Sequence, residues 1–167
     1  MPIAPTYTAL QTITLTSSAS SVTFSSIPNT YRDLVLSIIP KAAAAGPYDA
    51  GMQFNSDAGA NYSATVSYGN GSTLNLYTAL QNVNQIYLDF QGSVQNAFNQ
   101  NCIAHVFDYA ATDKHKGVLS RSNRTNSGLD LISSRWRSTV AINSIKYFLI
   151  GGTLDVGTKV SLYGIEG

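Results

Sequence analysis

Cys102 and His105 are residues whose types and spacing could do chemistry, because a thiolate and an imidazole three positions apart can begin a metal site. The segment that holds them, 102–109, alternates along its length in the manner of a β-strand. On a strand, residues three apart point to opposite faces, so these two cannot bind one ion without distortion. We therefore interpret Cys102 as a structural cysteine and His105 as a hydrogen-bonded histidine, and we expect no metal and no other cofactor.

Asp108, Asp113 and His115 could form a hydrolase triad with one of the many serines. No G-x-S-x-G nucleophile elbow singles out one of those serines. A glycosidase pair would require Asp89 and Asp108 to converge with no glutamate near them. The sequence thus predicts no catalytic residue, and we expect a protein that acts by binding rather than an enzyme.

A calcium-like pattern is formed by Asn55, Asp57, Gly59 and Asn61, which occupy alternate positions. Val66 stands where an EF-hand loop would need its final bidentate glutamate. The pattern favours a polar turn over a calcium site.

Basic residues are concentrated between positions 113 and 146, where only Asp113 and Asp130 are acidic. Trp136 would face away from its neighbours Arg135 and Arg137 on a strand, so the three do not form one platform for stacking on bases or sugars. The formal net charge of +1 gives no global field to attract nucleic acid or an anionic membrane, and we expect neither as a partner. The candidates for contact with a protein partner are Lys114, Lys116, Arg121, Arg124, Arg135 and Arg137.

The elements that must position these residues read as short strands with turn residues between them, which is typical of a sandwich or barrel. Leu34, Leu36 and Ile38 share one face by period-two alternation, and that face is expected to point into the core. A short helix is considered for 79–82, and a β-bulge is expected at Asn143-Ser144. The predicted strands are 8–15, 22–24, 33–39, 52–54, 62–68, 85–91, 102–109, 116–122, 139–149 and 159–165.

Composition supports an all-β chain. Only 11% of the 167 residues are charged, and Glu166 is the only residue of glutamate, a favoured helix former. The length suits one domain, which we place at 1–167 with a short N-terminal arm of about residues 1–7. Cys102 is the only cysteine, which excludes an intrachain disulfide. Because the start MPIAPTYTAL lacks a secretory signal pattern, we expect a soluble chain synthesised in a cytoplasm.

Several motifs, in order along nearly the whole chain, resemble those of small tailed-bacteriophage virion structural proteins, encountered notably in cyanophages. The first is the Phe-x-x-Ile-Pro-x-x-Tyr-x-Asp-Leu pattern at 24–34, and the second is the Phe-Asn-x-Asp-x-Gly-x-Asn-Tyr-Ser pattern at 54–63. The later landmarks are Asp108-Tyr109, the stretch 114–121 with its Ser120-Arg121, the Trp-Arg-Ser-Thr block within 135–145, and Leu162-Tyr-Gly-Ile165.

The resemblance implies a virion structural protein that is displayed on the particle and built as a jelly-roll-like antiparallel β-sandwich. We expect about 8–10 strands and a location on the virion at the capsid surface. The expected function is a capsid decoration (cement) protein that binds the phage major capsid protein. Few charges guard the strand edges, and together with the resemblance this predicts a homo-oligomer, most simply a homotrimer. The alternative is a tail-fibre or appendage module that binds host surface polysaccharide through loops such as 61–72.

Overall fold

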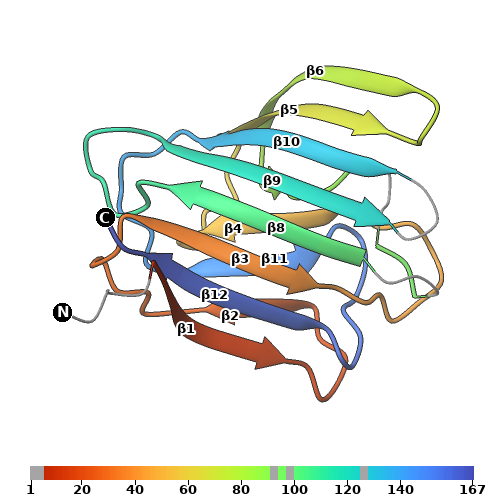
Figure 1. Ribbon diagram of the computed structural model, residues 1–167, viewed down its shortest axis with the longest axis horizontal. Coiled ribbons are helices and arrows are strands. Elements are labelled where there is room, and N and C mark those ends of the chain that lie inside the picture. The colour runs from red at the N-terminus through yellow and green to blue at the C-terminus, as the bar shows by residue number, and fades with distance from the viewer. Residues whose placement is uncertain (1–5, 91–93, 97–99, 125–127) are drawn as a thin grey trace.

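The computed structural model describes residues 6–90, 94–96, 100–124 and 128–167. Within these ranges every regular element is a strand, and all the strand pairs are antiparallel (Figure 1). No helix long and apolar enough to cross a membrane occurs among them. The predicted N-terminal arm lies mostly outside the described residues, and Tyr7 already opens the first strand.

Two sheets make up the fold, an eight-stranded sheet in front and a four-stranded sheet behind it in Figure 1. In spatial order the large sheet contains β1 (Tyr7–Thr14), β12 (Lys159–Ile165), β3 (Asp33–Ile39), β8 (Gln100–Phe107), β9 (Lys116–Arg124), β10 (Leu129–Trp136), β5 (Tyr62–Gly69) and β6 (Leu74–Val83). The small sheet contains β2 (Ser21–Phe24), β11 (Ile145–Leu149), β4 (Ala50–Phe54) and β7 (Ile86–Tyr87). The all-β sandwich is therefore confirmed, with two strands more than the sequence predicted.

The core lies between the sheets and follows the alternation of the strands. Leu34, Leu36 and Ile38 are buried as predicted. Opposite them, the small sheet contributes rings and aliphatic side chains that are fully enclosed, such as Phe24, Phe54 and Tyr147. A smaller cluster around Val66 and Ile132 fills the space beneath β5 and β10.

Three predictions about local structure are wrong. Residues 79–82 belong to strand β6 rather than to a helix. Residues 139–144 lie outside any strand, so the change of phase at Asn143-Ser144 marks the start of β11 rather than a bulge. Of the predicted strand 85–91, the described residues 85–90 keep only Ile86–Tyr87 as strand.

The corner before β3 is held by aromatic residues. The Tyr109 hydroxyl donates to the Pro28 carbonyl and lies 3.4 Å from the Tyr31 backbone nitrogen. The Tyr31 ring packs directly over Gly164 of β12, where a Cβ would lie 2.4 Å from the ring. The Ile-Pro-x-x-Tyr motif is thus a structural corner that fastens β3 to its neighbours.

Candidate functional site

No other element of the described chain covers the front of the eight-stranded sheet (Figure 1). Strand β10 shows the cause most clearly, because its residues alternate between exposed and buried along its whole length. The outward-pointing side chains of the three central strands β8, β9 and β10 form a surface that we call the outer face. They are Asn101, Ile103, His105, Phe107, Leu119, Arg121, Asn123, Leu129, Leu131, Ser133 and Arg135.

Apolar side chains dominate the centre of the outer face. Leu129 is 62% exposed, Leu131 48% and Leu119 42%. A solvated face of an antiparallel sheet ordinarily carries polar residues at these alternate positions. Clustered exposed leucines on a sheet therefore indicate a surface that binds something.

Arg121 lies in the middle of this apolar surface. In the strand register it stands directly between Ile103 on β8 and Leu131 on β10. These three residues line two shallow hollows, of about 410 Å³ and 280 Å³, so the Arg121 side chain stands between them. His105, Leu119 and Ser120 complete the lining of the smaller hollow.

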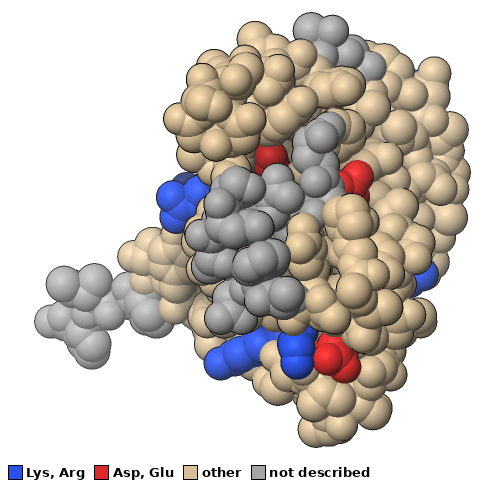
Figure 2. Space-filling view, turned by 90° about the vertical axis from the view of Figure 1, so that its right-hand side faces the viewer, with Lys and Arg blue, Asp and Glu red and all other residues tan. Residues whose placement is uncertain are grey.

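The charge of this region is of one sign. None of the ion pairs of the described residues involves Arg121 or Arg135. The strands β5, β6, β8, β9 and β10 contain a single acidic residue, Asp130, and its side chain points inward and is buried. Figure 2 shows how thinly charged groups are spread over the adjoining side of the molecule.

The predicted basic candidates do not form one surface. Arg121 and Arg135 share the outer face, whereas Lys114 pairs with Asp108 at 3.4 Å in the loop before β9. Arg137 follows β10 and donates to the Ala60 carbonyl and to Asn82 Oδ1, the latter at 2.7 Å. Arg124 ends β9, and its side chain lies outside the described residues.

The position of Lys116 differs from the prediction that it contacts a protein partner. Its side chain points inward and is fully buried, and its Nζ donates to the carbonyls of Lys114 and Thr139 at 3.0 Å and 3.2 Å. Burial lowers the pKa of this ammonium group. Lys116 therefore fastens a loop to the sheet and is not offered to a partner.

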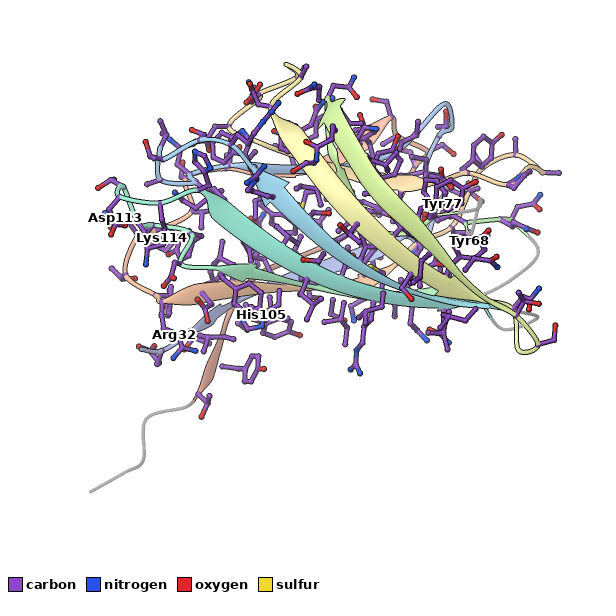
Figure 3. The ribbon with its side chains drawn as sticks, turned by 90° about the horizontal axis from the view of Figure 1, so that it is seen from above. Arg32, Tyr68, Tyr77, His105, Asp113 and Lys114 are labelled. Carbon is purple, nitrogen blue, oxygen red and sulfur yellow. The ribbon has the colours of Figure 1, made fainter. Side chains whose placement is uncertain are left out.

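A polar cluster at one end of the large sheet was not predicted. Asp33 Oδ2 accepts from His105 Nε2 at 3.1 Å and from Arg32 Nε at 3.0 Å, and its Oδ1 accepts from the Asp108 backbone N–H at 2.8 Å. Burial acts to raise the pKa of Asp33, but these hydrogen bonds outweigh it and lower the pKa. Figure 3 shows Arg32 and His105 at this end of the sheet, with Tyr68 and Tyr77 at the opposite end.

The hydrogen bonds of this cluster have a structural role. Both oxygens of Asp33 are engaged by protein donors, and the His105 ring stacks on Phe107 with centroids 4.1 Å apart. The arrangement orients the imidazole at the margin of the outer face. The sequence carries no local signal for this cluster, because the cluster depends on the register of β3 against β8, which pairs Val35 with His105.

The other sequence candidates lie apart. Cys102 points inward and His105 outward, as the alternation predicts. In the calcium-like loop, Asp57 accepts hydrogen bonds from Trp136 Nε1 at 2.7 Å and from Asn61 and Gly59, so its carboxylate ties the loop to β10. Asp89 is buried in the interior, whereas Asp108 is at the surface beside Lys114.

The loop region proposed for a sugar site is also largely engaged within the chain. Tyr62 is fully buried and stacks on Trp136 with centroids 6.3 Å apart. Asn70 Oδ1 accepts from the backbone nitrogens of Ser72 and Thr73 and so closes the β5–β6 hairpin. Tyr68 packs against Tyr77 and Phe90 on the inner side of the sheet.

Comparison with known proteins yields distant structural likeness only. No protein-family model matches the chain, and no curated protein matches it either. A protein of unknown function from Shewanella oneidensis MR-1 aligns with a TM-score of 0.25 and 8% identity over 96% of this chain and 75% of its own. The carbohydrate-binding module CBM40 of the Ruminococcus gnavus IT-sialidase aligns with a TM-score of 0.33 and 11% identity over 95% and 91%.

A third structure, the alginate lyase Aly36B, aligns with a TM-score of 0.27 and 9% identity over 90% of this chain and 72% of its own. At such TM-scores none of these likenesses bears on what this chain binds. The geometry of the outer face is the firmer guide.

Proposed function

We propose that the chain is a structural protein of a tailed-bacteriophage virion, a capsid decoration (cement) protein that binds the major capsid protein and stabilises the head. The observation that carries the proposal is the apolar outer face with Arg121 at its centre. A sheet face of this kind suits a protein that acts by covering another surface. The sequence motifs supply the link to virion proteins.

The motif residues themselves hold the sandwich together. Tyr109 fixes the Pro28 carbonyl, Asp57 binds the Trp136 indole, and Tyr31 covers Gly164. These contacts explain why such residues mark a fold rather than a site. Binding specificity then belongs to exposed residues, such as Leu129 and Leu131 outside the motifs and Leu119 and Arg121 within the stretch 114–121.

Association of copies is part of the proposal. The two edges of the large sheet are β1 and β6, and neither strand contains a charged residue. Charged side chains on an edge strand discourage pairing with another chain, and their absence leaves both edges open to it. A homotrimer on a local threefold position of the capsid would cover these edges and clamp neighbouring capsid subunits.

Copy number distinguishes decoration from the appendage alternative. Quantitative mass spectrometry of purified virions should find on the order of hundreds of copies per particle, because decoration repeats with the capsid lattice. A count of about a dozen or fewer would contradict decoration and favour the polysaccharide-binding appendage.

The docking surface is tested on heads that lack the chain, from a phage in which its gene is deleted. Purified wild-type chain should co-sediment with these heads, and Leu131→Asp should weaken binding at least about tenfold by placing an unpaired charge in the interface. Val140→Asp is the matched control, since Val140 is 60% exposed in the loop between β10 and β11. Equal loss in both variants would argue against the outer face.

A further inference from the structure

We propose that Arg121 is the anchor of the outer face and that it receives a carboxylate from an acidic and apolar surface of a protein partner. This inference rests on the proposed function and specifies the chemistry of the partner. It commits to a partner different from this chain.

The surroundings of Arg121 are those of an energetically dominant contact. Ile103 and Leu131 flank it across the neighbouring strands, and Leu119 lies two positions away on its own strand. An arginine enclosed by apolar side chains is shielded from water once a partner covers it, and contacts of this kind dominate binding energy. The hollows on either side of it offer space for apolar side chains of the partner.

The charges around Arg121 indicate that the partner group that binds it is a carboxylate. No carboxylate among the described residues pairs with Arg121. The only acid on β8, β9 and β10, Asp130, borders the larger hollow, but its side chain is buried and accepts hydrogen bonds from Ser122 and the Phe90 backbone N–H. A guanidinium that becomes buried without a counter-charge is costly, so a partner that covers it must supply one. A carboxylate matches the planar fork of arginine with two parallel hydrogen bonds.

The same charge pattern disfavours a second copy of this chain on the outer face. In a two-fold dimer each patch meets its own copy, so Arg121 and Arg135 would face cations and leucines with no acid to receive them. Asp33, at the margin of this face, is already engaged by His105 and Arg32, and Asp108 is engaged by Lys114. Self-association through the sheet edges leaves the outer face free for the partner.

Nucleic acid is a poorer match than protein. Phosphate backbones are bound by several cations in a row, whereas Arg121 is separated from Arg135 by Leu131 and Ser133 on the neighbouring strand. The side chains next to Arg121 are the aliphatic Ile103, Leu119 and Leu131, and the aromatic pair His105 and Phe107 lies at the margin of the face. Branched aliphatic side chains fit the apolar core of a protein interface.

The experiment measures binding of the purified full-length chain to heads that lack it, with charge variants at single positions. Arg121→Glu should weaken binding about 100-fold or more, because it sets two like charges against each other. Arg121→Lys should lose about tenfold, because it keeps the charge but not the bidentate geometry. Lys146→Glu, an exposed strand cation on the small sheet, should change binding less than about twofold.

Arg135→Glu provides a second control on the same face. Its effect should be several-fold smaller than that of Arg121→Glu, because Arg135 lies beside Ser63, Thr65 and Ser133 in a polar hollow. Thermal unfolding of each variant should match the wild type, since the substituted side chains are exposed.

The outcomes separate the two proposals. If wild-type chain does not bind the heads, the proposed function fails and this inference fails with it. If wild type binds and Arg121→Glu binds equally well, or loses no more than Arg135→Glu, only the inference is overturned. Binding of duplex DNA or of host polysaccharide that depends on Arg121, or dimerisation abolished by Arg121→Glu, would also overturn it.

Discussion

At the residue scale, the direction of a strand side chain decides what a charge can do. Lys116 and Arg121 lie on the same strand five positions apart, and odd spacing sends them to opposite faces. Lys116 is enclosed and satisfied by backbone carbonyls, whereas Arg121 faces outward without a carboxylate partner among the described residues. The difference between the buried Lys116 and the outward-facing Arg121 cannot be read from net charge or from the clustering of cations in the sequence. It becomes visible only in the strand register.

Asp89 is an acid whose pKa is strongly altered by its surroundings. It is fully buried, and its oxygens accept from the Ala50 backbone N–H at 2.7 Å and from Gln100 Nε2 at 2.9 Å. Burial raises the pKa of Asp89 to about 8, and the two hydrogen bonds offset only part of that effect. The side chain is therefore mainly protonated in the folded protein at neutral pH.

We predict that this proton makes stability fall as the pH rises. The unfolded chain releases it near pH ~3.9 and the folded chain near pH 8, so the contribution is complete below the first value and lost through the second. The slope in that window is at most about 1.4 kcal/mol per pH unit. Denaturant unfolding followed by Trp136 fluorescence between about pH 5 and 8 measures it.

Asp89→Asn is the matched variant for that experiment. The amide cannot ionise, and Gln100 can turn its own amide to meet it, because Gln100 Oε1 has no hydrogen-bond partner among the described residues. The pH slope should largely disappear in the variant. An unchanged slope would assign the pH dependence to other groups.

At the element scale, the corner between β2 and β3 depends on close packing. The Tyr31 ring occupies the space in which a side chain at Gly164 would lie. We predict that Gly164→Ala displaces Tyr31 and lowers the free energy of unfolding by about 1–3 kcal/mol. Thermal or denaturant unfolding of the purified variant measures the change.

Gly117→Ala is the control for the corner, because it is also a strand glycine but its nearest neighbour would be a Phe107 ring carbon at 3.7 Å, an ordinary contact. It should change stability by less than about 0.5 kcal/mol. Similar losses in both variants would show that loss of glycine in a strand, rather than the contact with Tyr31, is responsible.

The strands were predictable from sequence where one face is apolar and the other polar. The bounds of β3 and β12 agree with prediction to the residue, and in β3 the buried Leu34, Leu36 and Ile38 alternate with Val35, Ser37 and Ile39, which are more exposed. Strand β6 was missed because its pairing with β5 is irregular in two places and its apolar residues keep no single phase. Strand β10 was missed because Leu131 and Ile132 are adjacent and apolar on both faces.

The outer face was only partly predictable for the same reason. Sequence placed Arg121 and Arg135 among the candidates, but it could not tell which face of β9 or β10 the second sheet covers. The register that brings Ile103, Arg121 and Leu131 into one row involves three strands, and it is fixed by pairing rather than by local pattern. An apolar residue that faces a partner looks in sequence like one that faces the core.

At the scale of the whole molecule, the sandwich has one face and two edges that invite association. The outer face combines leucines with a single sign of charge, which suits a different protein. The edges β1 and β6 lack charge altogether, which suits a second copy of the chain. Separate surfaces for self-association and for docking would let one oligomer bind a repetitive lattice at several points.

We predict that the purified chain sediments as a species three times its own mass of 17.8 kDa. Leu76→Lys should shift the sedimentation toward the monomer, because a lysine on the edge strand β6 opposes pairing with another strand. Leu76 is 69% exposed, so the unfolding temperature of the monomeric chain should change little. Sedimentation velocity across a range of protein concentrations measures the shift. Val140→Lys is the control, because Val140 is a similarly exposed loop residue, and this variant should leave the oligomer intact. A wild-type chain that stays monomeric at all concentrations would contradict the trimer, whereas a trimer indifferent to Leu76→Lys would show that the subunits meet away from β6.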